Sequence, residues 1–116
     1  MPEPELSEQL RRRIQVLQTR RRSLESKLLQ PRSMIAASLV ERFLGTGSAR
    51  RSSPAYYLSR SLQGRSQLSY VKKAELDATR QRCEAYRSFQ QNLAAWWQLT
   101  AELEGLWKRL QQSQVA

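Results

Sequence analysis

The segment AYYLSRSLQGRSQLSYVKK, which runs from Ala55 to Lys73, decides the fold of this chain. Aromatic and branched residues, which favour strands, lie in both of its halves, with Gln63-Gly64 between them. Glycine at the second position of a two-residue turn suits the positive φ angle of a type I′ turn. The segment is therefore predicted to form a β-hairpin with the cross-strand pairs Leu62 with Arg65, Tyr57 with Tyr70, and Tyr56 with Val71.

Two further segments lie upstream of the hairpin. Met34 to Phe43 has apolar residues at spacings that suit either a short helix or a strand with a bend. Gly45 to Ser53 follows with two glycines, several serines and the pair Arg50-Arg51, a composition typical of a loop.

A long helical pattern precedes this β unit, from Leu6 to Gln30, and Pro31 ends it because proline lacks an amide hydrogen. Heptad spacing of its apolar residues predicts a seam that packs against another helix. The seam consists of Leu10, Ile14, Leu17, Leu24 and Leu28, with Arg21 in one core slot. Three interpretations of Arg21 stay open: a device that fixes the register, a contact to nucleic acid, or a side chain that extends to solvent.

A second helical pattern runs from Lys73 or Ala74 to about Gln112. Its seam is also heptad-spaced and consists of Tyr86, Phe89, Leu93, Trp96, Thr100, Leu103, Trp107 and Leu110, and Leu99 and Leu106 widen it to one side. The two seams predict a mainly helical α+β fold, with two long antiparallel coiled-coil-like helices and a small three-stranded β unit inserted between them. Residues 1–31 would form the basic N-terminal helix, 32–73 the basic β unit and 74–116 the C-terminal helix, all within one structural domain.

The second helix is predicted to be the longer one, by on the order of 20 Å at 1.5 Å per residue. Its C-terminal part is then expected to lack a partner within the chain. An apolar stripe of this size favours docking to a second copy or to a different protein. The predicted protein-interface residues are Phe89, Leu93, Trp96, Trp97, Leu103, Trp107 and Leu110.

The charge of the chain favours an anionic partner. Its net charge is +10, and residues 32–73 hold eight Lys and Arg against Glu41 and the nearby Glu75. Nucleic acid is the first candidate for such a basic unit. The sequence contains no run of about 18 apolar residues, so no membrane span is predicted. The single Cys83 excludes an internal disulfide and fits a reducing cytoplasm.

Catalysis has little support in the sequence. The chain has no His, Asp77 is its only Asp, and no serine has an evident activating partner. The segment around Gly45 and Gly47 lacks the lysine that a phosphate-binding loop contains. We therefore expect no catalytic residue, metal or cofactor, and a protein that is not an enzyme.

The candidate nucleic-acid contacts are the basic and aromatic residues of the β unit. Arginine offers forked donors that match phosphate oxygens, and tyrosine rings stack on unpaired bases. The alternatives are that the arginines form a solvated face and that the tyrosines pack the hairpin against the helices. The candidates are Arg42, Arg50, Arg51, Arg60, Arg65, Lys72, Lys73, Tyr56, Tyr57 and Tyr70.

The chain from Ser38 to about Leu103 resembles a small bacterial and archaeal family of unknown function that is often encoded beside transposases. The matching blocks are SLV with Arg42-Phe43, Pro54 to Ser59, the turn Gly64-Arg65, and Tyr70 to Lys73. This resemblance favours a strand for Met34 to Phe43 and implies an association with mobile elements.

The chain departs from the family pattern in one block. Thr46 to Arg51 replaces a Cys-rich segment, and Ser52 replaces a His. The family pattern implies a loop held by a metal, so this chain is expected to be a metal-free relative whose loop a ligand or partner orders.

Two functional hypotheses follow. The first is a non-enzymatic nucleic-acid-binding accessory subunit of a mobile-element or RNA-guided complex, with the β unit on phosphate and the Trp-rich helix on protein. The second is a protein-interaction module, an adaptor or an inhibitor, that makes no contact with nucleic acid.

Overall fold

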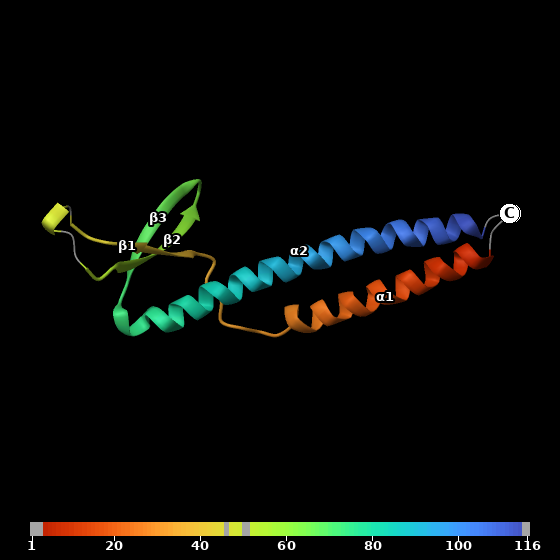
Figure 1. Cartoon of the computed structure of the whole chain (residues 1–116), viewed down its shortest axis with the longest axis horizontal. Helices are drawn as coiled ribbons and strands as arrows, with labels where there is room; N and C mark the ends of the chain where they lie inside the picture. Colours follow the sequence, from red (N-terminus) through yellow and green to blue (C-terminus); the bar gives the residue numbers. More distant parts are fainter. Residues whose placement is uncertain (1–3, 46, 50–51, 115–116) are drawn as a thin grey trace. The chain divides into compact units, whose positions relative to one another are not determined.

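The computed structural model of the chain describes residues 4–45, 47–49 and 52–114. Its elements are α1 (Pro4–Leu28), β1 (Ser38–Arg42), the 3₁₀ turn η1 (Gly47–Ala49), β2 (Ala55–Leu62), β3 (Arg65–Val71), the 3₁₀ turn η2 (Lys73–Glu75) and α2 (Leu76–Ser113) (Figure 1). Two long helices with an antiparallel three-stranded sheet between them in chain order confirm the predicted fold class. The chain divides into two compact units, a helical unit of Met1–Pro31 with Phe89–Ala116 and a sheet unit of Arg32–Ser88.

Leucine-rich stripes from α1 and α2 hold the helical unit together. The buried core consists of Leu10, Ile14 and Leu17 from α1 with Leu103, Leu106 and Leu110 from α2, and Leu99 packs against it. The Leu17 side chain is 0% exposed, the most deeply buried of the set. Complete burial of a leucine contributes about 2 kcal/mol, so this stripe is the main source of stability in the unit. These three α1 residues belong to the seam that heptad spacing predicted, whereas its other leucines, Leu24 and Leu28, are half-buried.

Polar contacts along the same interface show that the two helices run antiparallel. The Ser7 and Ser113 hydroxyl oxygens lie 3.0 Å apart, and Arg13 Nη2 lies 3.3 Å from Glu102 Oε1. Residues near the start of α1 thus meet residues near the end of α2. The expectation that the C-terminal part of α2 lacks an intrachain partner is therefore wrong, because α1 covers it. Leu103 and Leu110, two of the residues predicted to bind another protein, belong to this internal core.

The buried seam of α2 also differs from the predicted one. Leu106 enters the core where the heptad pattern placed Trp107, and Trp107 is 51% exposed. Successive residues of a helix are about 100° apart, so burial of Leu106 turns Trp107 to the edge of the interface. A leucine at this position lets the two helices pack closely, whereas the larger indole of a tryptophan would hold them further apart.

The sheet unit contains strands in the order β1-β2-β3, with both neighbouring pairs antiparallel. The hairpin register is the predicted one: Leu62 pairs with Arg65, Tyr57 with Tyr70 and Tyr56 with Val71. Gln63 and Gly64 have φ angles of 53° and 77°. Positive φ at both central residues is what a type I′ turn requires, and it matches the right-handed twist of the strands.

The segment from Met34 to Phe43 is a strand only in its second half. β1 begins at Ser38, and no helix forms in this segment. Upstream of β1 the Ile35 amide donates a 3.2 Å hydrogen bond to the Arg82 carbonyl of α2, and the Ala37 amide donates one of 2.9 Å to the Ile35 carbonyl. The prediction of a strand from Met34 to Phe43 is therefore wrong for its first four residues and for Phe43. Before β1, a helix carbonyl accepts from the Ile35 amide and a carbonyl within a tight turn accepts from the Ala37 amide, so neither amide pairs with a strand.

Candidate nucleic-acid interface

Strand pairing assigns each side chain of the sheet to one of two faces, because successive residues point to opposite sides. The Tyr56 face carries Leu39, Glu41, Tyr56, Leu58, Arg60, Leu62, Arg65, Gln67, Ser69 and Val71. The Tyr57 face carries Ser38, Val40, Arg42, Ala55, Tyr57, Ser59, Ser61, Ser66, Leu68 and Tyr70. The predicted nucleic-acid contacts are thus divided between the two faces.

The Tyr56 face has a covered end and an open end. The Arg80 guanidinium of α2 lies over the Tyr56 ring, 5.8 Å from its centroid, and Val71 opposite Tyr56 is buried. Tyr56 therefore packs within the sheet unit. This agrees with the alternative that the tyrosines pack the hairpin against the helices. Toward the turn, Arg60 and Arg65 are exposed on the same face.

The Tyr57 face carries an aromatic pair. The rings of Tyr57 and Tyr70 meet edge to face, with centroids 5.7 Å apart and planes at 68°. Tyr57 is half-buried, whereas Tyr70 is 64% exposed. Of the tyrosines predicted to stack on bases, Tyr70 offers the most ring surface to a ligand.

Five basic residues on or next to the strands lack an ion-pair partner among the described residues, whereas Arg80 Nη1, also in the sheet unit, lies 3.9 Å from Asp77 Oδ1. Within the described part of the chain, no ion pair involves Arg42, Arg60, Arg65, Lys72 or Lys73, and all five are exposed. By contrast, Arg12, Arg13 and Arg21 of α1 each pair with a glutamate. The sequence also has no acidic residue between Glu41 and Glu75. This unit therefore presents uncompensated positive charge to an anionic partner.

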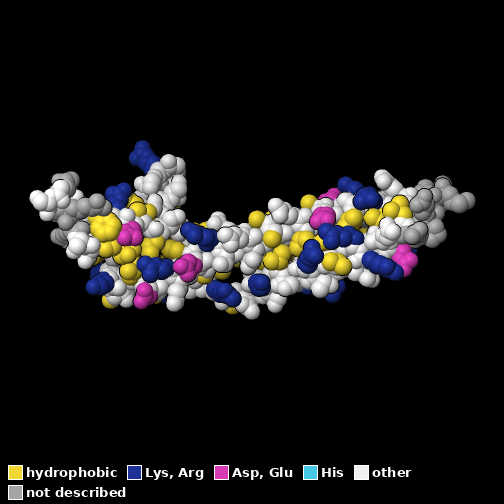
Figure 2. Space-filling view, viewed as in Figure 1, with side chains coloured by type: hydrophobic (Ala, Val, Ile, Leu, Met, Phe, Trp, Pro, Cys, Tyr) yellow, Lys and Arg dark blue, Asp and Glu magenta, His cyan; other side chains and the backbone are white. Residues whose placement is uncertain are grey.

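These charges surround the sheet and do not form one cluster. Arg60 and Arg65 share the Tyr56 face near the turn, whereas Arg42 lies on the Tyr57 face of β1. Lys72 and Lys73 follow β3, at the end of the hairpin away from the turn. Figure 2 shows a Lys or Arg side chain at the outer end of the hairpin. The predicted contacts Arg50 and Arg51 lie outside the described residues.

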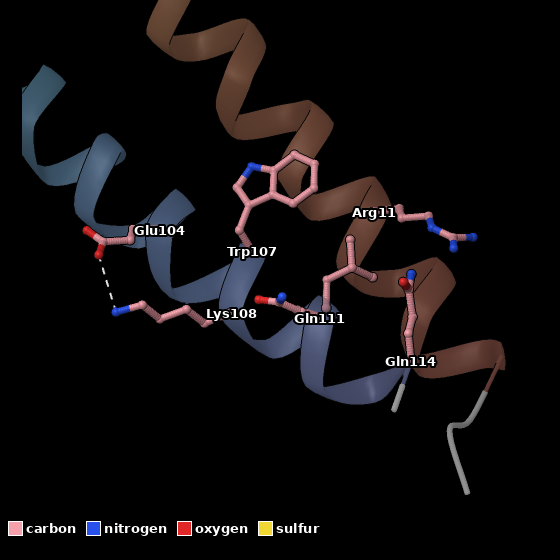
Figure 3. Close-up of a pocket in the computed structure, with 7 residues that line it drawn as sticks. Arg11, Glu104, Trp107, Lys108, Gln111 and Gln114 are labelled. Atoms are coloured by element: carbon pink, nitrogen blue, oxygen red, sulfur yellow. Dashed lines mark ion pairs between the residues drawn. The ribbon is translucent and has the colours of Figure 1, made fainter. Parts of the chain in front are cut away.

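The helical unit offers a separate, partly apolar surface. Trp97 and Trp107 are 60% and 51% exposed, whereas Phe89, Leu93 and Trp96 are half-buried. Trp107 lies in a groove of about 630 Å³ (Figure 3). The groove is lined by Arg11, Glu104, Trp107, Lys108, Leu110, Gln111 and Gln114. The place of Arg11 in this groove was not predictable from the sequence, because it depends on how α1 aligns with α2.

In the described part of the chain, the remaining reactive groups form no catalytic or metal site. Cys83 of α2 is half-buried, and burial raises the pKa of its thiol, although the nearby Arg87 opposes the shift. Among residues 4–45, 47–49 and 52–114, no three Cys, Asp or Glu side chains lie together in a way that could hold a metal ion. No described helix is long and apolar enough to cross a membrane.

Comparisons of the chain with protein-family models, with curated proteins and with solved structures each found no match. The resemblance to a family encoded beside transposases stays a prediction.

Proposed function

We propose that this chain is a non-enzymatic nucleic-acid-binding accessory subunit that acts in the cytoplasm. Its sheet unit contacts phosphate, and the tryptophan-bearing surface of its helical unit docks a protein. The resemblance stated above is the basis for placing it in a mobile-element or RNA-guided complex.

One observation carries the proposal: the sheet unit has exposed Arg and Lys side chains without ion-pair partners in the described part of the chain. Exposed positive charges that no acidic side chain offsets attract a polyanion, and Arg60 and Arg65 lie on one face of the hairpin. Arg42, Arg60 and Arg65 can each donate two parallel hydrogen bonds to a phosphate. The exposed ring of Tyr70 adds a surface on which an unpaired base can stack.

The proposal is tested by fluorescence anisotropy of the full chain with labelled duplex and single-stranded DNA and RNA over a salt series. Binding is expected to weaken steeply with salt, with a slope of about −0.9 per neutralised phosphate on B-form DNA. Absence of binding to all four probes at low salt would overturn the proposal.

A protein-interaction module without nucleic-acid contact is the second candidate. The exposed Trp97 and Trp107 side chains favour it, because exposed tryptophans are common centres of protein interfaces. Nuclease-free purification separates the candidates. Co-purifying nucleic acid, seen as a high ratio of absorbance at 260 to 280 nm, supports the first, and a clean protein with a stoichiometric partner supports the second. A monomer at high concentration would exclude self-association through Trp97 and Trp107 and leave a different protein as the partner.

A further inference from the structure

The outer half of the hairpin extends beyond the third strand of the sheet. β1 pairs with β2 only from Ala55 to Ser59, so the stretch from Arg60 to Gln67 contains two strands and their turn. Every residue of this stretch, which we call the ribbon, is exposed. Its strands pair through Arg60 with Gln67, Ser61 with Ser66 and Leu62 with Arg65.

The two faces of the ribbon differ in size and chemistry. Its Tyr56 face carries the long side chains Arg60, Leu62, Arg65 and Gln67, whereas its Tyr57 face carries only Ser61 and Ser66. The ribbon contains no acidic residue. A surface built only to hold phosphate would gain little from the apolar Leu62, and it would gain more from a further cation than from the uncharged Gln67. The composition therefore indicates a further role for this face.

The side chains of the Tyr56 face match the chemistry of base edges. Arginine donates a bidentate pair of hydrogen bonds to the O6 and N7 atoms of guanine. Glutamine both donates to N7 and accepts from N6 of adenine, and an apolar side chain contacts the methyl group of thymine. Arg60 and Gln67 are directly opposed across the two strands. The Cβ atoms of opposed residues lie about 5 Å apart, so the two side chains can reach neighbouring base pairs.

The dimensions of the ribbon suit the major groove of B-form DNA. Paired strands lie about 4.8 Å apart. A groove about 12 Å wide thus accepts both strands with a few ångströms on each side for side chains. The major groove of A-form RNA is too deep and narrow for side chains to read.

We propose that the ribbon enters the major groove of double-stranded DNA and reads base edges with Arg60, Arg65 and Gln67. This inference rests on the proposed function. Lys72 and Lys73, at the other end of β3, then contact phosphate and position the ribbon without sequence preference.

The first test uses the full chain and matched labelled duplexes, one with unmodified cytosine and one with glucosylated 5-hydroxymethylcytosine, which fills the major groove. Glucosylation is expected to weaken binding about tenfold or more, and the minor-groove ligand distamycin is expected to leave it unchanged. Equal affinity for the two duplexes, with steep salt dependence, overturns groove entry and leaves the proposed function standing. No binding to any nucleic acid overturns both.

The second test uses the double variant R60K/R65K, which keeps both charges and loses both guanidinium forks. Selection from a random duplex pool is expected to enrich a sequence motif with the wild type and not with the variant. The salt slope of the variant is expected to equal that of the wild type. Failure of the wild type to enrich a motif, or enrichment of the same motif by both proteins, overturns base reading.

Discussion

The indole Nε1 of Trp96 donates a 2.9 Å hydrogen bond to Oε1 of Glu25, which joins α2 to α1. Arg21 Nε lies 3.6 Å from the same oxygen, and Arg21 Cζ lies 5.9 Å from the centre of the Trp96 ring. Arg21 occupies a core slot of the α1 seam, where Glu25 offsets its charge and Trp96 covers it. These contacts favour the interpretation that Arg21 fixes how α1 aligns with α2.

Replacement of Trp96 by Phe is expected to lower the free energy of unfolding by about 1–2 kcal/mol, because Glu25 loses a hydrogen-bond donor. Glu25→Gln keeps an acceptor oxygen and should cost less than Glu25→Ala. Urea denaturation of Trp96→Phe, Glu25→Ala and the double variant measures the coupling. Strict additivity would show that the hydrogen bond contributes nothing to stability.

Leu17 fills the centre of the helical core, so Leu17→Ala is expected to cost about 2–5 kcal/mol through lost burial and a cavity. Leu29 is 80% exposed and supplies the matched control, for which the expected change is within about 0.5 kcal/mol. Denaturant midpoints of both variants check the prediction. Similar losses in the two variants would mean that α1 does not pack on α2 through this stripe.

The hairpin turn depends on Gly64, whose φ of 77° is costly for any residue with a side chain. A Cβ atom at Gly64 would meet no atom within 4 Å, so the cost of Gly64→Ala is one of backbone conformation. We expect a loss of about 1 kcal/mol, and a small gain for Gln63→Asn, because asparagine tolerates positive φ better than glutamine. Amide hydrogen exchange of residues 60–67 measures both effects, and faster exchange in Gln63→Asn than in the wild type would contradict the turn assignment.

Burial raises the pKa of the Cys83 thiol, so the neutral thiol persists to higher pH than in an unfolded chain. The fraction of reactive thiolate near neutral pH is then smaller, and modification by an aromatic disulfide reagent is expected to be slower than in urea. The difference should shrink as pH rises through the pKa of the folded state. Equal rates in the native and unfolded chain near neutral pH would contradict the effect of burial.

Local signals predicted the hairpin well. A two-residue turn ending in Gly64 fixes which residues oppose each other, so the pairing of Tyr57 with Tyr70 required no knowledge of the rest of the chain. The same holds for the α1 seam, because apolar residues such as Leu10 and Leu17 recur at one helical period.

The alignment of the helices was not predictable in this way. Both the Leu103, Trp107, Leu110 set and the Leu103, Leu106, Leu110 set have helical spacing, and only packing against α1 selects the second. The first turns of α2 belong to the sheet unit, where the Arg80 guanidinium lies over the Tyr56 ring. The later part of α2 is therefore the part that pairs with α1. For the site, composition located the basic unit, but only the strand register assigned Arg60 and Arg65 to one face and Arg42 to the other.

The central claim is that nucleic acid binds the sheet unit, and the most direct measurement compares two variants that lose the same charge. R60A/R65A/K72A/K73A removes four exposed charges from the sheet unit, and R11A/R20A/R22A/K27A removes four from α1. Anisotropy with labelled duplex DNA is expected to show a loss of roughly 100-fold or more in affinity for the first variant, and a change of only a few-fold for the second. Equal losses in the two variants, or wild-type affinity in the first, would contradict the account.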